Sequence, residues 1–338
     1  MAWLADQLHA RGLKLGLYAA ASVLTCRDFP GSQGFEEVDA ATFASWGADF
    51  VKLDSCTKTP LASGAESWYN QYTRWSVALA ASGRDIVFSC SWAFYWADCA
   101  RKYGAAACGP SPLSDHYIAR ICNMWRYDYD LEPTWTNGYG GIFDLLVNAA
   151  VSPVTAAFRA LTAPGAFNDP DFLVVGCALD GPCEPGGDHP LPPLTQVQQR
   201  TQFSMWCLLA APLIIGSDIR FLDAYALETL SNADAIAINQ DGLFARPRTL
   251  NGTAAQGDPR GAVWARDLRG GDAAVALLNL GGAPLVLGLN LTQLGWVAGG
   301  AGSVFDVWSK ARAHVGGPAY SAVVPPFTAT LLRFSPAL

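Results

Sequence analysis

The sequence has little of what proteins use to bind nucleic acids, zinc or membranes. Its 22 lysines and arginines are outnumbered by 29 aspartates and glutamates, which gives a net charge of −7 at pH 7. An acidic chain is poorly suited to bind nucleic acid or an anionic membrane surface. No CxxC pair occurs and the four histidines are scattered, so the sequence offers no usual zinc site. No apolar run is long enough to span a bilayer, and we expect neither a membrane span nor a metal or other cofactor.

Export signals in the sequence are indirect. Residues 1–8 begin in mid-helix, with neither a basic n-region nor a continuous apolar segment, so we expect no signal peptide in this chain. Nine cysteines, in contrast, indicate an oxidising compartment with one thiol left over. The tripeptides that start at Asn251 and Asn290 match the N-glycosylation sequon, which agrees with secretion.

Strand-like and helix-like segments alternate from residue 3 to residue 241. Six strand units are predicted, at residues 13–19, 50–54, 86–90, 121–126, 164–171 and 212–218. Helices are predicted at residues 3–11, 38–46, 68–81, 142–161, 196–209 and 224–232. This alternation is typical of a parallel α/β fold.

The texture of the sequence changes after residue 241. The segments that follow are short, alternate between apolar and polar residues, and are separated by Gly, Pro and Asn. They lie at residues 261–268, 273–280, 284–291, 303–308 and 322–334. Such spacing predicts an antiparallel β-sandwich. We therefore expect two domains, a catalytic (β/α) domain over residues 1–241 and a sandwich over residues 242–338.

Carboxylates stand at the ends of several predicted strands, where (β/α) enzymes place their chemistry. They are Asp54, Asp130, Asp169, Asp171 and Asp218. Two of them, acting as nucleophile and general acid/base, would suffice to hydrolyse a glycosidic bond. The 12 tryptophans and 11 tyrosines are compatible with a carbohydrate ligand, since aromatic rings line sugar clefts as readily as they fill cores. Composition does not say which two carboxylates act, and any one of them could instead cap a helix or a turn.

Five ordered motifs resemble one known family. They are GLKLGLY at 12–18, KLDSC at 52–56, NMWR at 123–126, PGAFNDPD at 164–171 and AAPLI at 210–214. Together they resemble glycoside hydrolase family 27, the α-galactosidases and α-N-acetylgalactosaminidases, from about residue 3 to residue 241 and more loosely beyond. The resemblance implies a (β/α)8-type barrel followed by an antiparallel β-sandwich, and a retaining hydrolase that removes terminal α-linked galactose.

The family's catalytic pair corresponds to Asp54 and Asp130. The resemblance implies that Asp54 is the nucleophile that attacks the anomeric carbon. Lys52 is then a hydroxyl donor to the sugar whose positive charge helps to keep Asp54 ionised. Asp130 is implied as the general acid/base. In a retaining enzyme the two carboxyl groups lie roughly 5 to 6 Å apart.

The resemblance also implies the residues that line the sugar pocket. They are Tyr18, Lys52, Ser91, Phe94, Tyr95, Arg126 and Asp171. Two of these positions indicate different substrates. In the family, a Ser at the position of Ser91, followed by a small Ala three residues on, makes room for a 2-acetamido group, whereas a Glu contacts the 2-hydroxyl of galactose. Here Ser91 matches the first type and Phe94 does not, so galactose and N-acetylgalactosamine both remain open.

Eight of the nine cysteines are predicted to pair. The family resemblance implies Cys26 with Cys56 and Cys90 with Cys122, and short local loops suggest Cys99 with Cys108 and Cys177 with Cys183. Cys207 lies in an apolar segment and is expected to be a buried free thiol.

The chain departs from the family at its start. The family begins with two further βα units, which supply an aromatic wall and an Asp-Asp pair that holds the sugar's 4- and 6-hydroxyls. Because this chain lacks them, we expect an N-terminally incomplete barrel with unpaired strand edges and weaker turnover. A non-catalytic carbohydrate-binding protein on the same scaffold is the alternative. The expected partner is an oligosaccharide or glycoconjugate that contains α-galactoside. A homodimer and a secreted, lysosomal or vacuolar location are compatible with the family.

Overall fold

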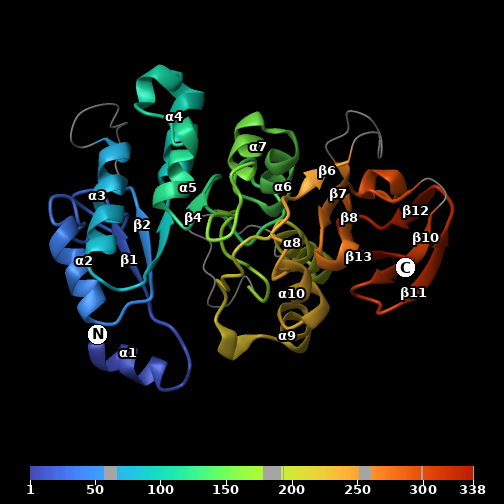
Figure 1. Ribbon diagram of the computed structural model, residues 1–338, viewed down its shortest axis with the longest axis horizontal. Helices are drawn as coiled ribbons and strands as arrows, with labels where there is room; N and C mark the ends of the chain where they lie inside the picture. Colours follow the sequence, from blue (N-terminus) through green and yellow to red (C-terminus); the bar gives the residue numbers. More distant parts are fainter. Residues whose placement is uncertain (57–66, 178–191, 193, 251–259, 298–299, 338) are drawn as a thin grey trace. The chain divides into compact units, whose positions relative to one another are not determined.

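The computed structural model describes all of residues 1–338 except 57–66, 178–191, 193, 251–259, 298–299 and 338 (Figure 1). The chain forms two compact units. The first contains Met1–Tyr127 and Pro164–Asp169, and the second contains Asp128–Ala163 and Pro170–Leu338. The predicted domain division at residue 241 stays a prediction.

The first unit is built on a parallel sheet of five strands. In sequence and in space their order is β1 (Gly16–Ala20), β2 (Phe50–Asp54), β3 (Val87–Cys90), β4 (Met124–Arg126) and β5 (Phe167–Asp169). All four pairings are parallel, as the alternation of strands and helices predicted. The carboxyl ends of all five strands therefore lie at one edge of the sheet, and Asp54 is the last residue of β2.

Aromatic side chains pack one face of this sheet against the helices. Helix α2 (Glu36–Ser45) packs on α3 (Trp68–Ala81), and the bounds of α3 agree with the prediction. The side chain of Ser67 caps α3 by accepting a hydrogen bond from the amide of Asn70. Tyr72 of α3 is fully buried, and its ring lies 6.4 Å from that of Phe88 on β3. Buried aromatic side chains thus pack α3 against one face of the sheet.

The segment after β3 is helical, which the sequence analysis missed. Helix α4 runs over Trp92–Tyr103, and its buried residues Trp92, Trp96 and Cys99 recur at helical spacing. This spacing indicates a helix, but the sequence analysis interpreted the segment as an irregular region rich in cysteine. The other helices of the unit are α1 (Ala2–His9), η1 (Ala105–Cys108), η2 (Ser114–His116) and α5 (Tyr117–Ile121).

The second unit begins with two helices where one was predicted. The helical sequence at 142–161 is divided into α6 (Ile142–Val151) and α7 (Pro153–Arg159). Proline lacks an amide hydrogen and is favoured in the first turn of a helix, so Pro153 starts α7 and Ser152 caps it. Among the described residues no single helix meets the length and hydropathy needed to cross a membrane, and α6 and α7 do so only when joined across a bend of 82°.

The remaining described helices of this unit precede the sandwich strands along the chain or connect two of them. They are α8 (Gln196–Leu208), η3 (Ile219–Phe221), α9 (Ala224–Leu230), α10 (Ala233–Asn239), η4 (Arg269–Gly271) and η5 (Leu291–Leu294). The predicted sixth strand, at 212–218, is reduced to an isolated parallel bridge between Leu173 and Ile215.

In the described part of the C-terminal region, eight antiparallel strands confirm the predicted β-sandwich. One sheet has the order β11-β10-β13-β8-β7-β6 and the other pairs β12 with β9. The strands are β6 (Arg248–Thr249), β7 (Gly261–Asp267), β8 (Ala273–Asn279), β9 (Leu285–Asn290), β10 (Ala301–Asp306), β11 (Arg312–Gly316), β12 (Ala319–Val324) and β13 (Thr328–Pro336). The segment predicted at 322–334 is divided between β12 and β13, and the sequence analysis missed β6 and β11. Leu277 and Phe334 of the larger sheet share a core with Leu287 of the smaller one.

A buried arginine joins this sandwich to the helices of the second unit. Arg266 of β7 is fully buried, and its guanidinium donates hydrogen bonds to the backbone carbonyls of Cys207, Ile238, Asn239 and Ala245. Some of these carbonyls end helices α8 and α10, where a cation is favoured by the helix dipole. Burial nevertheless lowers the pKa of Arg266, because the charged form loses hydration.

A carboxylate at the opposite end of β2 from Asp54 ties the first unit together. Asp49 accepts hydrogen bonds from His9 (2.7 Å), from the amide of Leu15 (2.9 Å) and from Arg84 (2.7 Å). Burial raises the pKa of Asp49, but these hydrogen bonds outweigh burial and hold the pKa well below its usual range.

We therefore predict that Asp49→Asn lowers the free energy of unfolding at neutral pH by about 2 to 3 kcal/mol. Because the folded-state pKa is lowered, the Asp49 carboxylate stabilises the fold above its unfolded pKa of about 4, and this contribution is lost as the pH falls. Urea unfolding at about pH 7 and pH 3 checks this. The unsubstituted chain should lose more stability than the variant between the two pH values, and equal losses would contradict the prediction.

Candidate active site

The register of the five-stranded sheet brings the predicted site residues onto one face. Tyr18 on β1 pairs with Lys52 on β2, and Ala20 pairs with Asp54 one pleat further on. On the other side of the sheet's centre, Arg126 on β4 pairs with Asp169 on β5. Because residues alternate between the two faces of a strand, Tyr18, Lys52 and Asp54 share a face at the carboxyl end of the sheet.

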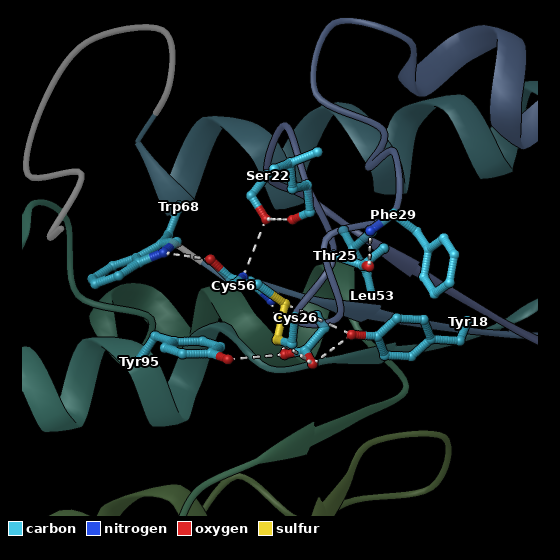
Figure 2. Close-up of a disulfide and its surroundings, with 12 residues drawn as sticks. Tyr18, Ser22, Thr25, Cys26, Phe29, Leu53, Cys56, Trp68 and Tyr95 are labelled. Atoms are coloured by element: carbon cyan, nitrogen blue, oxygen red, sulfur yellow. Dashed lines mark hydrogen bonds between the residues drawn. A yellow bond between two sulfur atoms is a disulfide. The ribbon is translucent and has the colours of Figure 1, made fainter. Parts of the chain in front are cut away.

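Three hydrogen bonds hold the Asp54 carboxylate (Figure 2). The hydroxyl of Tyr18 donates to Oδ2 at 2.8 Å, and the hydroxyl of Tyr95 donates to Oδ1 at 3.0 Å. The amide of Ser55 also donates to Oδ1, at 2.8 Å. Donors to an ionised carboxylate favour the charged form and fix its orientation. The structure thus presents an oriented carboxylate at the end of a central strand, with both of its oxygens in hydrogen bonds.

A disulfide lies against this carboxylate. Cys26, in the loop after β1, is joined to Cys56, which follows β2. The sulfur of Cys26 lies 3.6 Å from Oδ2 of Asp54, and the sulfur of Cys56 lies 3.7 Å from the hydroxyl of Tyr18. The amide of Cys56 donates to the hydroxyl oxygen of Ser22, which holds the same loop. Figure 2 shows Cys26, Cys56, Ser22 and Tyr18 around this disulfide.

The cluster of Cys26, Cys56 and Asp54 is compact enough to suggest a metal site, since their ligand atoms lie within 4.8 Å of one another. The two sulfurs, however, are bonded to each other and carry no thiolate charge. Thiolates are the form of cysteine that binds metals. In the disulfide form the three residues therefore make a rigid wall of the site and not a metal centre.

A fully buried tyrosine supports the site from the helix side of the sheet. The hydroxyl of Tyr72 donates to the carbonyl of Leu53 at 3.1 Å, and the amide of Ser91 donates to the same carbonyl at 3.2 Å. Burial raises the pKa of Tyr72 well above its ordinary value, and the nearby charge of Asp54 raises it further. Tyr72 is therefore a neutral donor that holds the ends of β2 and β3 together.

Ser91 and Phe94, which indicate different substrates, lie at the start of α4. Ser91 is the N-cap residue of α4 and is 4% exposed. Phe94 lies one turn further along and is partly exposed, and its ring centroid is 5.3 Å from that of Tyr95. Phe94 is thus next to a residue that contacts Asp54.

The second unit carries Asp130, Asp171 and Asp218, whereas Asp169 ends β5 in the first unit. Asp130 is exposed, and Leu131 next to it donates its amide to Oδ2 of Asp171 at 2.8 Å. Asp171 is buried and has a φ of +85°, a conformation that costs free energy for any residue but glycine. Its other oxygen accepts the amide of Phe172, and the indole of Trp206 donates to its carbonyl. Asp171 therefore holds the loop that carries Asp130.

Asp54 and Asp130 belong to different compact units, so their predicted separation stays a prediction. Asp218, another carboxylate at a predicted strand end, has a local role. Hydrogen bonds from Arg220 hold the pKa of Asp218 at about 2, and its side chain caps the short helix η3.

Most of the cysteine predictions are confirmed. The disulfides are Cys26 with Cys56, Cys90 with Cys122 and Cys99 with Cys108. Cys177 is also disulfide-bonded, but Cys183 lies outside the described residues and its pairing with Cys177 stays a prediction. Cys207 is a buried free thiol, and burial raises its pKa. The sequon at Asn251 also lies outside the described residues, whereas Asn290 is exposed.

Sequence reasoning missed the residues directly behind Asp54. Ser55 and Trp68 are both buried, and the indole nitrogen of Trp68 donates to the hydroxyl of Ser55 at 2.9 Å. Trp68 also stacks on Tyr95, with ring centroids 6.0 Å apart and planes inclined by 26°. The spacing of Trp68 and Tyr72 could have indicated these contacts, because residues four apart share one face of the helix that follows the Asp54 strand.

The parallel sheet with its strand-end carboxylate and the antiparallel sandwich place the chain in the class of (β/α)-barrel proteins with a C-terminal β domain. A family model described as α-galactosidase A matches residues 1–241, and one for the α-galactosidase C-terminal β-sandwich domain matches residues 259–334. The chain therefore belongs to the α-galactosidase A family, glycoside hydrolase family 27.

Individual relatives agree with this assignment. The chain is 36% identical over 277 residues to human α-galactosidase A, which covers 82% of this chain and 55% of the human protein. It is 32% identical over 308 residues to α-N-acetylgalactosaminidase from Gallus gallus, covering 90% of this chain and 66% of that protein. The crystal structure of α-galactosidase I from Mortierella vinacea shares the fold, with a TM-score of 0.74 and 24% identity over 99% of this chain and 79% of that one. The chain thus spans between about half and two thirds of the length of the human and Gallus gallus proteins.

We predict that the Cys26–Cys56 disulfide supports both stability and the site. The double variant Cys26→Ser/Cys56→Ser opens a loop of 30 residues and should lose about 3 to 4 kcal/mol of unfolding free energy. In a crystal structure of this variant the Tyr18 hydroxyl should lie more than 3.5 Å from Oδ2 of Asp54, compared with 2.8 Å here, because Tyr18 and Asp54 lose their shared wall. The matched control is Cys99→Ser/Cys108→Ser, which opens a loop of 9 residues and should lose about 2 to 3 kcal/mol without lengthening this distance. Equal changes of the distance in the two variants would contradict the prediction.

Proposed function

We propose that the chain is a retaining glycoside hydrolase that removes terminal α-linked galactose from oligosaccharides or glycoconjugates. The observation that carries the proposal is the Asp54 carboxylate, held at the carboxyl end of β2 by Tyr18, Tyr95 and the amide of Ser55. Membership of the α-galactosidase A family supports the same chemistry. A carboxylate that is oriented before the substrate arrives loses little entropy when it reacts, and this lowers the barrier.

In the first step, an oxygen of Asp54 attacks the anomeric carbon and the bond to the leaving oxygen breaks. Asp130 gives its proton to that oxygen, so the aglycone departs as a neutral alcohol. In the second step, a water molecule attacks the anomeric carbon from the side that the aglycone left. Asp130 takes the proton of this water, the bond to Asp54 breaks, and the sugar leaves with its original configuration.

The tyrosines around Asp54 have a changing role in this cycle. While Asp54 is an anion, the hydroxyls of Tyr18 and Tyr95 stabilise its charge. When the glycosyl bond forms, that charge is lost and the hydrogen bonds weaken. They are restored as Asp54 leaves in the second step, which helps to release the sugar. Arg126, Lys52 and Asp171 are proposed to contact the sugar hydroxyls, with Arg126 at the 2-position.

The natural partner is proposed to be an α-galactoside in an oligosaccharide or glycoconjugate. A secreted, lysosomal or vacuolar location is supported by the three described disulfides, because such bonds persist in oxidising compartments. The exposed Asn290 would accept a glycan there. A homodimer is the assembly that we propose from the family resemblance.

We predict that the purified chain hydrolyses aryl α-galactosides, and that Asp54→Asn reduces kcat by about 10⁴-fold because the nucleophile is removed. Asp130→Asn should reduce kcat by about 10² to 10⁴-fold on substrates whose leaving group needs a proton. Release of the chromogenic phenol measures both effects, and proton NMR of the first product should show retention of the α configuration.

The non-catalytic alternative makes a different prediction for the same proteins. If the folded chain turns over neither aryl α-galactoside nor aryl α-N-acetylgalactosaminide but binds either sugar, and Asp54→Asn binds it equally well, the chain is a carbohydrate-binding protein. Inversion of the anomeric configuration would contradict the retaining mechanism even if hydrolysis occurs.

Substrate choice is predicted to depend on Phe94. Because its ring lies beside Tyr95 where the family needs a small residue to admit an acetamido group, the unsubstituted chain should prefer galactose. Phe94→Ala should raise the ratio of kcat/KM for aryl α-N-acetylgalactosaminide over aryl α-galactoside by about tenfold. Phe35→Ala, which removes an exposed ring outside the site, is the control and should leave the ratio unchanged. An unchanged ratio in Phe94→Ala would show that Phe94 does not face the 2-position.

A further inference from the structure

We propose that Trp68, a residue outside the predicted sugar pocket, is a positioning residue that fixes the Asp54 carboxylate through Tyr95, while the hydrogen bond to Ser55 anchors its own indole. The inference rests on the proposed function, because it takes Asp54 as the group that reacts. It goes beyond that function by assigning a role to a buried helix residue that touches neither Asp54 nor, in our proposal, the sugar.

The first step of the argument concerns Oδ1 of Asp54. This oxygen accepts two hydrogen bonds, from the amide of Ser55 and from the hydroxyl of Tyr95. Oδ2 faces the hydroxyl of Tyr18, whose side chain is 48% exposed. The orientation of the carboxylate therefore depends most on Oδ1, whose donors are a buried backbone and a partly buried phenol.

Trp68 contacts both residues that supply these donors. Its indole nitrogen donates to the hydroxyl of Ser55 at 2.9 Å, and its ring stacks on Tyr95. Figure 2 shows the rings of Trp68 and Tyr95 lying one above the other, and the hydroxyl of Tyr95 donates to Oδ1 of Asp54. A single side chain thus holds the two residues on which Oδ1 depends.

The rigidity of Trp68 makes this contact effective. Trp68 is 4% exposed and is the first residue of α3, directly after the N-cap Ser67. Four residues later on the same helix, Tyr72 holds the carbonyl of Leu53. The first turn of α3 is therefore fixed to the end of β2 at two points, Ser55 and Leu53, which are the two neighbours of Asp54 in the chain.

Tyr95 is held in part by its stack on Trp68. Its ring is partly exposed at the start of α4 and also contacts Phe94, with centroids 5.3 Å apart. A phenol that can rotate would spend part of its time away from Oδ1. An offset aromatic pair restricts such motion and contributes modestly to stability beyond the area that it buries.

A double-mutant cycle on kcat/KM for aryl α-galactoside tests the proposal. The four proteins are the unsubstituted chain, Trp68→Leu, Tyr95→Phe and Trp68→Leu/Tyr95→Phe. We expect Trp68→Leu to reduce kcat/KM by about tenfold, mostly through kcat, in the presence of the Tyr95 hydroxyl. In the Tyr95→Phe background the same substitution should cost less than about twofold, because the hydroxyl that Trp68 positions is already gone.

A structural role alone would give a different result. If Trp68 only fills the core, Trp68→Leu will reduce kcat/KM by the same factor in both backgrounds, and the proposal is overturned. Trp68→Phe keeps an aromatic face and should recover most of the activity lost in Trp68→Leu, which also guards against a variant that fails to fold. Trp3→Leu is the control for loss of a tryptophan, since Trp3 is 72% exposed in α1, and it should leave kcat/KM unchanged.

Crystal structures of the variants separate this proposal from the proposed function. In Trp68→Leu the distance from the Tyr95 hydroxyl to Oδ1 should exceed 3.5 Å, compared with 3.0 Å here. If the chain turns over no substrate, the proposed function fails and this distance alone decides the positioning role. If the chain is active and the distance in Trp68→Leu is unchanged, the positioning role fails and the proposed function stands.

Discussion

The structure around the candidate site depends on one constraint, which is that a carboxylate at the end of a buried strand must be given hydrogen-bond donors. An ion that loses water without gaining partners costs several kcal/mol. Asp54 gains the hydroxyls of Tyr18 and Tyr95 and the amide of Ser55. Each donor must in turn be held in place, and this requirement accounts for the disulfide, the aromatic stack and the buried tyrosine that surround the carboxylate.

The supports of Asp54 come from both directions along the chain. The Cys26–Cys56 disulfide fixes the loop after β1 beside Tyr18, and helix α3 fixes the end of β2 through Trp68 and Tyr72. At the other end of β2, Asp49 binds His9 and Arg84 and secures the start of the strand. Strand β2 is therefore held at both ends by charged or polar contacts and along its middle by apolar packing, so its terminal carboxylate has little freedom to move.

In the second unit, Asp171 supports the loop that carries Asp130. Asp171 adopts a left-handed backbone conformation and uses its carboxylate to hold the amide beside Asp130. Strain of this kind persists only where the surroundings impose it, and here Trp206 holds the carbonyl of Asp171 from the buried helix α8. The two proposed catalytic carboxylates are thus supported by different chemistry, hydroxyl donors for Asp54 and a tethered loop for Asp130.

The sequence by itself determined the periodic parts of this protein. Alternating strand and helix patterns gave the parallel sheet, helix α3 at its observed bounds, and the antiparallel strands of the sandwich, because hydrophobic periodicity reflects which faces are buried. The five ordered motifs indicated the family, and through it they implied Asp54 and Asp130 as the catalytic carboxylates. Two predictions from periodicity were wrong in detail. Pro153 divides the helix predicted at 142–161, and the strand predicted at 212–218 forms only a bridge.

Only the tertiary structure decided how Asp54 is held. Tyr18 and Tyr95 stand 36 and 41 residues away from it in the chain, and no local pattern links a phenol to a distant carboxylate. The stack of Trp68 on Tyr95 likewise joins two helices whose facing sides are set by packing on the sheet. Periodicity specifies which face of an element is buried, whereas the partner of each polar group depends on how the elements pack in three dimensions.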